Sequence, residues 1–392
     1  MNKSVALLAL LVGCGDNVKQ EAPDAAVDAP PPWAEAVPSA VPQLISLGGS
    51  VLDHPKVQPI FFTGDDAIQA QVEQFLTQMG ASDYWKATTQ EYGVGALSVM
   101  PTIVTSDAPP ATQDALNAWV DAHVPTPDPQ TIYAIFLADG VVLQAPDGNS
   151  CDAYGAFHDE SPHGVVFALM PRCEPSPQFD HAQTKLDELT ISTSHELIEA
   201  ATDPHVETTP AYGDVDADHA VWGIVPGAET GDFCEYVDSA YIKGVGDFMV
   251  QRTWSNAAAK AGHDPCVPAP ASPYIAAAPI FTEPVPIDGY TGTRTTKAVQ
   301  LGVNATKTIE IDLFSDQQTD AYSVDVEDAA AMYGSPAELA FAWDTPLGKN
   351  GDKLHLSIKR LRAATDGPGS IFLLSTKTAA GTVSQWWGYV AN

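Results

Sequence analysis

The sequence is poor in basic residues. Its 392 residues include 18 Lys and Arg against 50 Asp and Glu, which gives a formal net charge of −32. So acidic a protein repels phosphate backbones and anionic lipid headgroups, and nucleic acid is therefore excluded as an expected partner. Cations and basic polymers are the compatible partners. Most of the excess acidic charge falls before residue 270, which indicates two parts with different surfaces.

The apolar run at the start of the chain, Val5–Val12, is too short to cross a bilayer. It follows Lys3 and ends in Leu11-Val12-Gly13-Cys14, which resembles a bacterial lipoprotein signal with a lipobox. Residues 1–14 are therefore predicted to be a signal peptide, and Cys14 is predicted to carry lipid. That places the protein in the bacterial cell envelope, periplasmic or surface-exposed and anchored to a membrane. Residues 15–42, rich in Pro, Ala and Asp, are predicted to be a disordered tether.

Cysteines are few, and no two have the close spacing of a zinc knuckle, which disfavours thiolate zinc ligands. Once Cys14 carries lipid, four remain, and four in an exported protein suggest two disulfides. Three pairings are open. The local one, Cys151 with Cys173 and Cys234 with Cys266, is favoured because each pair then brackets a loop-rich segment.

Residues 43–268 alternate short apolar runs with helical periods, which predicts an α+β domain with a sheet flanked by helices. The expected strands are Ile60–Phe62, Leu97–Val104, Thr131–Leu137 and Val165–Met170. The expected helices begin at Asp65 or Asp66, surround Tyr84-Trp85 up to Gly93, cover Thr112–Val120, and run from about Thr184 to Ala201. Thr202-Asp203-Pro204 ends the last helix, because a residue before proline disfavours helical torsions.

The end of the chain has a different rhythm. Residues 269–290, rich in Pro and Ala, are predicted to be a linker, and residues 291–392 a β-sandwich of about seven strands. The period-two runs are Thr308–Phe314, Tyr322–Val326, Glu338–Trp343, Lys353–Ile358, Ser370–Leu374 and Trp386–Val390. A module of this kind is expected to bind or to act as a spacer, since nothing in it resembles a catalytic constellation.

The chemistry is concentrated in His195-Glu196-x-x-Glu199, which reads as a zinc-protease helix with glutamate in place of the second histidine. Residues four apart in a helix share a face, so His195 and Glu199 could hold one ion while Glu196 activates a bound water. The alternative is a surface helix with acidic residues near its end.

With these motifs, residues 55 to 267 resemble the phosphate-induced/EXORDIUM-like family of secreted proteins. The resemblance is carried by Tyr84-Trp85, Tyr92, Cys151, His158, His195-Glu196-x-x-Glu199-Ala200-x-Thr202-Asp203-Pro204 and Glu229-Thr230-Gly231-Asp232-Phe233-Cys234. Gly155 stands where that family often has a second cysteine, and the segment between Pro204 and Glu229 lacks the family's Asn-Ala-Trp. The resemblance implies a secreted, zincin-like domain and motif positions more directly than it implies a reaction.

A zincin-type site needs three protein ligands and one open position. Glu229 and Asp232 are the favoured further ligands because they belong to the matching motif, and His158 is less favoured, its family counterpart lying in a cysteine-anchored loop. His205 is also less favoured; it sits where the extended pattern His-Glu-x-x-His-x-x-Gly-x-x-His places its last histidine. Zinc is the expected metal, although two carboxylates also suit harder cations and make a bound water less acidic.

Some of these residues have other interpretations. Asp232 could cap a loop beside Cys234, and His158 could be a structural hydrogen-bond donor. The loop Asp214-Val215-Asp216-Ala217-Asp218 lacks the glycine and the terminal glutamate of an EF-hand, so at most a weak calcium site is predicted. Ser192 and Ser194 do not predict a nucleophile, because no strand-turn-helix elbow precedes them.

Two functions follow as hypotheses. The first is a cell-envelope lipoprotein with a zinc-dependent, peptidase-like hydrolase domain, in which Glu196 moves the proton of the attacking water. Its substrate would be a peptide or a cell-surface polymer. The second is a non-catalytic cell-surface binding protein in which the motif is structural.

Overall fold

The computed structural model describes residues 36, 38, 40–146, 148–225, 227–289, 292–365, 367, 369–379 and 381–391. The predicted signal peptide, the predicted lipidation site Cys14 and most of the predicted tether lie outside these residues. Within the described ranges, no helix has the length and apolar character that crossing a membrane requires.

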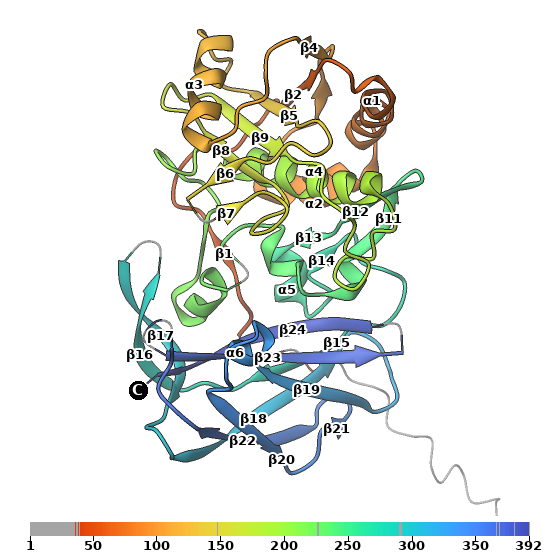
Figure 1. Cartoon of the computed structure of the whole chain (residues 1–392). Coiled ribbons are helices and arrows are strands. Elements are labelled where there is room, and N and C mark those ends of the chain that lie inside the picture. Colours follow the sequence, from red (N-terminus) through yellow and green to blue (C-terminus); the bar gives the residue numbers. More distant parts are fainter. Residues whose placement is uncertain are drawn as a thin grey trace, which may run out of the picture. The chain divides into compact units, whose positions relative to one another are not determined.

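The first region is built on a mixed sheet with the strand order β3-β2-β5-β9-β8, of which β2, β5, β9 and β8 are labelled in Figure 1. Its strands are β2 (Lys56–Phe62), β3 (Ser98–Val99), β4 (Ile103–Thr105), β5 (Thr131–Phe136), β8 (Phe157–Glu160) and β9 (Val166–Met170). Strands β2, β5 and β9 are parallel, whereas β8 runs antiparallel to β9 and forms one edge. Successive residues of a strand point to opposite faces, so both faces of this sheet need cover.

Helices cover both faces. Strand residues such as Phe61 and Phe136 pack in one core with α1 (Asp66–Gly80), α2 (Asp83–Thr89) and α4 (Lys185–Thr202). Their neighbours Ile60 and Ile135 pack on the opposite face with α3 (Gln113–His123). The predicted helices are therefore present. Gly93 follows the 3₁₀ turn η1 (Gln90–Tyr92) with a φ of 91°, a left-handed conformation that glycine adopts without a steric penalty.

Helix α4 begins with a capping box. The Thr184 side chain accepts a hydrogen bond from the backbone N–H of Asp187, and the Asp187 carboxylate accepts one from the backbone N–H of Thr184. The helix ends at Thr202, just before Asp203-Pro204, as the proline predicts. Its apolar side chains Leu197, Ile198, Ala200 and Ala201 are buried in the core. The motif is therefore held on a rigid element.

Two sequence expectations for this region need correction. The run Leu97–Val104, predicted to be one strand, is split into β3 and β4, and Pro101, which has no N–H to donate to a ladder, lies between them. Strand β8 was not predicted, because Phe157-His158-Asp159-Glu160 shows neither apolar alternation nor β-branched residues.

After α4 the chain forms short elements that return to the helix. These are β10 (Asp214–Val215), η2 (Ala217–Gly223), η3 (Asp232–Cys234), η4 (Asp238–Ala240), β11 (Tyr241–Val245), β12 (Phe248–Gln251), β13 (Thr253–Trp254), α5 (Asn256–Ala261) and β14 (Cys266–Val267). Strand β10 pairs with β1 (Leu44–Ile45), and strands β6 (Gln144–Ala145) and β7 (Gly148–Asn149) form a small hairpin before β8. Strand β12 packs along α4.

The C-terminal region is largely β and consists of one four-stranded and one six-stranded sheet. The four-stranded sheet contains β15 (Ile275–Pro279), β18 (Thr306–Ser315), β22 (Lys353–Arg360) and β20 (Leu339–Trp343). The six-stranded sheet contains β16 (Glu283–Gly289), β17 (Gly292–Gln300), β24 (Gly381–Ala391), β23 (Gly369–Thr378), β19 (Tyr322–Asp328) and β21 (Leu347–Gly348). A short helix, α6 (Ala329–Met332), follows β19.

The linker prediction differs from the structure. Strands β15 and β16 lie inside residues 269–290 and contribute to both sheets, so this segment belongs largely to the β region. The high Pro and Ala content of this segment led to the linker prediction, because both residues are depleted in strands. The two regions also pack directly. Trp222 lies 6.0 Å from Trp386 between ring centroids, and the Gln385 side chain donates a 2.7 Å hydrogen bond to the Phe233 carbonyl.

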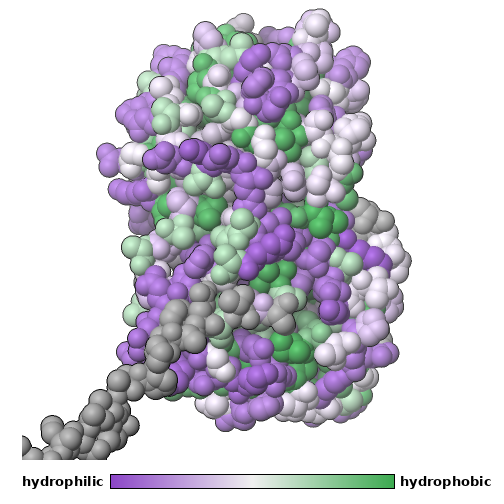
Figure 2. Space-filling view, turned by 180° about the vertical axis from the view of Figure 1, so that it is seen from behind, coloured by the Kyte–Doolittle hydropathy of each residue, from purple (hydrophilic) through white to green (hydrophobic). Residues whose placement is uncertain are grey.

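Both predicted disulfides are present, Cys151–Cys173 and Cys234–Cys266. Disulfides persist in oxidising compartments, so they indicate an extracytoplasmic protein. Polar and apolar residues are interspersed on the surface shown in Figure 2, where the apolar ones form small separate patches.

Candidate metal centre

Helix α4 brings the two outer residues of the motif into contact. The Nε2 atom of His195 lies 2.8 Å from Oε2 of Glu199, one turn further along the helix. Glu199 is 2 % exposed at its side chain and His195 is 15 % exposed. The carboxylate oxygen of Glu199 and the imidazole nitrogen of His195 are close enough for both to bind the same metal ion.

The segment around η3 supplies a third atom and orients Glu199. Oδ1 of Asp232 lies 3.6 Å from Nε2 of His195. The backbone N–H groups of Gly231 and Asp232 donate to Oε1 of Glu199, at 2.8 and 3.3 Å. Because Oε1 is occupied, Oε2 is left to face His195. His195, Glu199 and Asp232 thus form one group that could hold a metal ion.

The spacing in this group fits a small divalent cation. Ligands at about 2.0–2.1 Å from a tetrahedral zinc are roughly 3.3 Å from one another. The two separations from Nε2 of His195, 2.8 and 3.6 Å, lie on either side of that value. One nitrogen and two carboxylate oxygens also form a donor set that zinc accepts.

His158 on β8 joins a second group with Glu199 and Glu229. Its Nδ1 lies 3.3 Å from Oε2 of Glu196 and 3.9 Å from Oε2 of Glu199, and its Nε2 lies 3.4 Å from Oε1 of Glu229. These contacts use both ring nitrogens, so they do not converge on one donor atom as tightly as the contacts of His195 do. Nε2 is buried, and the 3.4 Å contact with Glu229 is not aligned as a hydrogen bond.

Gln251, at the end of β12, contacts the ring nitrogen of His195 that faces away from Glu199. Its Oε1 lies 3.0 Å from Nδ1 of His195, and its side-chain NH₂ donates to the Gly231 carbonyl at 2.7 Å. When Nδ1–H donates to Gln251, the lone pair of Nε2 points toward Glu199 and Asp232. Sequence reasoning did not find Gln251, since a lone glutamine in a strand gives no signal of this role.

Gly231 is required by close packing. A Cβ atom there would lie 2.7 Å from Nδ1 of His195 and 2.9 Å from Oε1 of Glu199. Both separations are shorter than real Cβ contacts, so a side chain would displace the ligand group. The motif glycine therefore lets the backbone reach Glu199.

The site opens into a cavity of about 540 Å³. His158, His195, Glu196, Glu199, Glu229 and Asp232 all line it. Burial alone would lower the pKa of both histidines, but the carboxylates outweigh it: Glu229 and Glu196 raise the pKa of His158, and Glu199 raises that of His195. Burial and Glu199 raise the pKa of Asp232 well above its usual value. A divalent cation would relieve this crowding of negative charge.

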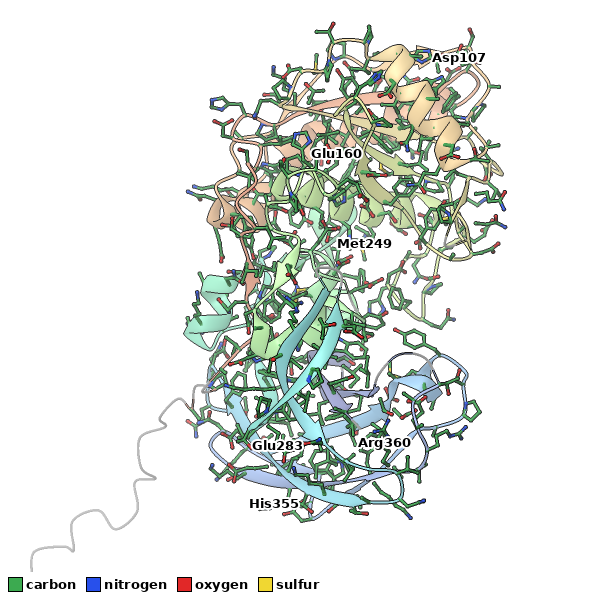
Figure 3. The ribbon with its side chains drawn as sticks, turned by 90° about the vertical axis from the view of Figure 1, so that its left-hand side faces the viewer. Asp107, Glu160, Met249, Glu283, His355 and Arg360 are labelled. Carbon is green, nitrogen blue, oxygen red and sulfur yellow. A yellow bond between two sulfur atoms is a disulfide. The ribbon has the colours of Figure 1, made fainter. Side chains whose placement is uncertain are left out.

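The remaining candidates lie elsewhere. His205 belongs to neither group; its Nδ1 is 2.9 Å from Oε2 of Glu160, which lies at the end of β8 (Figure 3). Ser194 donates to the Ile191 carbonyl and accepts from the backbone of Gln251, so it is held in the helix packing.

The predicted acidic calcium loop is also engaged with protein partners. Asp214 pairs with Arg294, and Asp218 pairs with Lys297 at 2.7 Å. Asp216 contacts His219 at 2.9 Å. Among the residues that the structure describes, the loop forms no group of the kind found around Glu199. The ion pairs with Arg294 and Lys297 hold β10 and η2 against β17, and the weak calcium site stays a prediction.

Comparisons with known proteins assign no family. No family model matches the chain, and no curated protein matches it. One solved structure, a chimeric titin Z1Z2 functionalized with a KLER exogenous peptide from decorin, is similar to the chain at 14% identity, over 29% of this chain and 92% of that chain, with a TM-score of 0.17. A TM-score this low carries no argument about fold or function. The resemblance to the phosphate-induced/EXORDIUM-like family stays a prediction from its motifs.

Proposed function

We propose that the protein is a zinc-dependent hydrolase with a zincin-like domain, and that its substrates are peptides. The observation that carries the proposal is the convergence of His195, Glu199 and Asp232 in an open cavity that Glu196 also lines. A structural ion needs no cavity beside it, whereas a hydrolase needs room for substrate. The antiparallel edge strand β8 beside α4 also suits a zincin-like arrangement.

In the proposed reaction, His195, Glu199 and Asp232 would hold the cation. When bound, the cation would act as a Lewis acid on the reacting carbonyl. Glu196 accepts the proton of the attacking water on its carboxylate and then passes it to the leaving amine. His158 Nδ1, 3.3 Å from Oε2 of Glu196, orients that carboxylate as a positioning residue.

The alternative is a non-catalytic binding protein whose motif is only a hydrogen-bond network. The 2.8 Å contact between His195 and Glu199 favours it, since a protonated imidazole and a carboxylate at this distance satisfy each other without an ion. The two functions differ in metal content and in the effect of removing the Glu196 carboxylate.

The test is to purify the full chain, measure bound metals by mass spectrometry, and follow cleavage of a denatured, fluorescently labelled protein. The proposal expects about one zinc per chain and a loss of cleavage of roughly 10²- to 10⁴-fold in Glu196→Gln, with the metal retained. Glu327→Gln, at an exposed position of β19, is the matched control and should cleave normally. A folded, metal-free protein, or full cleavage by Glu196→Gln, would overturn the proposal.

The predicted lipid anchor is also proposed here, as attachment of the extracytoplasmic protein to a membrane through Cys14. Its support is the signal-like start of the chain together with the two disulfides. Mass spectrometry of the mature N-terminus tests it. A diacylated or triacylated Cys14 is expected, and an unmodified Cys14 within an uncleaved start would contradict it.

A further inference from the structure

An exposed aromatic side chain of the C-terminal β region, Tyr333, is linked through Tyr236 to Phe179, which lines the cavity. Phe179 lines the cavity and is 42% exposed. Its ring lies 5.9 Å from that of Tyr236, and the Tyr236 hydroxyl lies 2.8 Å from the hydroxyl of Tyr333. Tyr333 follows α6 and is 59% exposed. We call Phe179, Tyr236 and Tyr333 the aromatic edge; it joins the cavity to the β region.

The cavity itself is strongly acidic. Its described lining includes nine carboxylate residues and two histidines, and none of these described residues is Lys or Arg. The carboxylates belong to Asp152, Glu174, Asp180, Glu188, Glu196, Glu199, Glu229, Asp232 and Glu235. Glu174 already pairs with Lys185, and the pKa values of Glu188 and Glu235 are raised to about 8 and about 7, so these three groups add little charge at neutral pH. One divalent cation would offset only part of the charge of the other six, and the rest remains to attract a cationic ligand.

Two of these carboxyl groups lie away from the metal centre. Asp180 and Glu188 share a hydrogen bond, and burial together with Asp180 raises the pKa of Glu188 to about 8. Neither forms an ion pair with a Lys or Arg among the residues that the structure describes. Phe179, the chain neighbour of Asp180, lines the same cavity, so the carboxyl pair adjoins the aromatic edge.

A second observation also indicates an incoming ligand. The Nε2 atom of His158 is buried, lies 3.4 Å from Oε1 of Glu229 and makes no well-aligned hydrogen bond, and the His158 side chain lines this cavity. The side chain is 4 % exposed. Buried polar atoms are rarely left unsatisfied, so a bound ligand with a hydrogen-bonding group at this point would complete the contacts of Nε2.

We propose that the cavity and the aromatic edge bind an extended polypeptide rich in Lys and Arg, with Tyr333 of the C-terminal region holding the part of the chain beyond the cavity. The inference rests on the proposed function for cleavage, although binding alone does not require it. Lys and Arg suit both surfaces, because their charged ends pair with carboxylates and their stems and cations pack on aromatic rings. An acidic peptide would meet uncompensated negative charge along the same path.

Binding is tested with the full chain carrying Glu196→Gln, so that no peptide is consumed. The probes are two fluorescein-labelled twelve-residue peptides, one alternating Lys and Ala and one alternating Glu and Ala. Fluorescence anisotropy should show the Lys peptide binding at least tenfold more tightly, with affinity falling as salt rises. Equal binding of both peptides, or no binding of either, would overturn the inference.

The aromatic edge is tested separately. Tyr333→Ala, at an exposed position where folding is not at risk, should weaken binding of the Lys peptide about fivefold or more, whereas Tyr333→Phe should retain most of it. Val303→Ala, another exposed apolar position in the β region, is the matched control and should bind as the parent does. A Tyr333→Ala variant that binds like the control would remove the β region from the binding surface.

These results separate the two proposals. Tight binding of the Lys peptide by a protein that cleaves nothing would leave this inference standing and remove the hydrolase. Cleavage of the denatured protein without preference for sites flanked by Lys or Arg, and without an effect of Tyr333→Ala, would do the reverse.

Discussion

Nε2 of His195 and Oε2 of Glu199 lie 2.8 Å apart across one turn of α4, and the second oxygen of Glu199 is held by the backbone N–H groups of Gly231 and Asp232. Glu199, which stands in the place of the second histidine of the zinc-protease motif, therefore still offers a metal-binding atom. It is a carboxylate oriented by a later segment of the chain, and that segment also supplies Asp232.

Removal of one ligand should remove the metal, whereas removal of the histidine outside the site should not. We expect His195→Ala to lose bound zinc and His205→Ala to keep about one zinc per chain. At zinc concentrations about 100 times the dissociation constant, bound metal adds roughly 2.7 kcal/mol to the free energy of unfolding, so only the His205→Ala protein should lose stability on chelation. Metal analysis and denaturant titration with and without chelator measure both effects. Equal zinc in the two variants would contradict the assignment.

Gly231 should tolerate no side chain. In Gly231→Ala the new Cβ would press on His195 and Glu199, so we expect weaker metal binding and a loss of about 1–3 kcal/mol of stability, the usual cost of overpacking. Gly302→Ala is the matched control, since a Cβ at Gly302 meets nothing within 4 Å. Isothermal titration with zinc and denaturant unfolding measure the two effects. If both alanine variants behave like the parent, the backbone does not approach the ligands as described.

Each disulfide should contribute substantially to stability. The bridges Cys151–Cys173 and Cys234–Cys266 close segments with separations of 22 and 32 residues. Loop-closure entropy predicts that each stabilises the fold by about 3.5 kcal/mol. We expect replacement of either pair by alanine to lower the free energy of unfolding by about that amount in denaturant titration. Cys234 ends η3, the turn that supplies Asp232, so loss of Cys234–Cys266 should also weaken metal binding. Unchanged metal binding in that variant would show that η3 is positioned without its bridge.

Stability of the metal-free protein should fall as pH rises above the usual pKa of glutamate. The pKa of Glu188 is raised from 4.5 to about 8, so the folded state binds its proton more tightly than the unfolded state does. Its contribution is therefore fully present below pH 4.5 and is lost between about 4.5 and 8, with a slope of at most about 1.4 kcal/mol per pH unit for one proton. Glu188→Gln should flatten the profile in this range, and Glu327→Gln should not. The free energy of unfolding measured across pH 4–9 in chelator tests this, and an unchanged Glu188→Gln profile would refute it.

The sequence determined the elements that depend on local patterns. The apolar spacing from Ile68 to Met79 and the stop at Pro204 predicted α1 and the end of α4, because a helix needs only contacts three and four residues apart. The spacing of His195, Glu196 and Glu199 predicted their shared helix for the same reason. The local cysteine pairing was also readable, since each bridge spans a short stretch of chain.

Only the tertiary structure decided which distant residues complete the site. Asp232, Gln251 and His158 come from a 3₁₀ turn, a hairpin strand and an unpredicted edge strand, and no local period relates them to α4. His205 fitted a sequence spacing better than any of them, yet it contacts Glu160. Short sequence motifs identify the candidate ligands. Their convergence on one point depends on how the sheet, the hairpin and the η3 turn pack around α4, and this packing is a property of the whole fold.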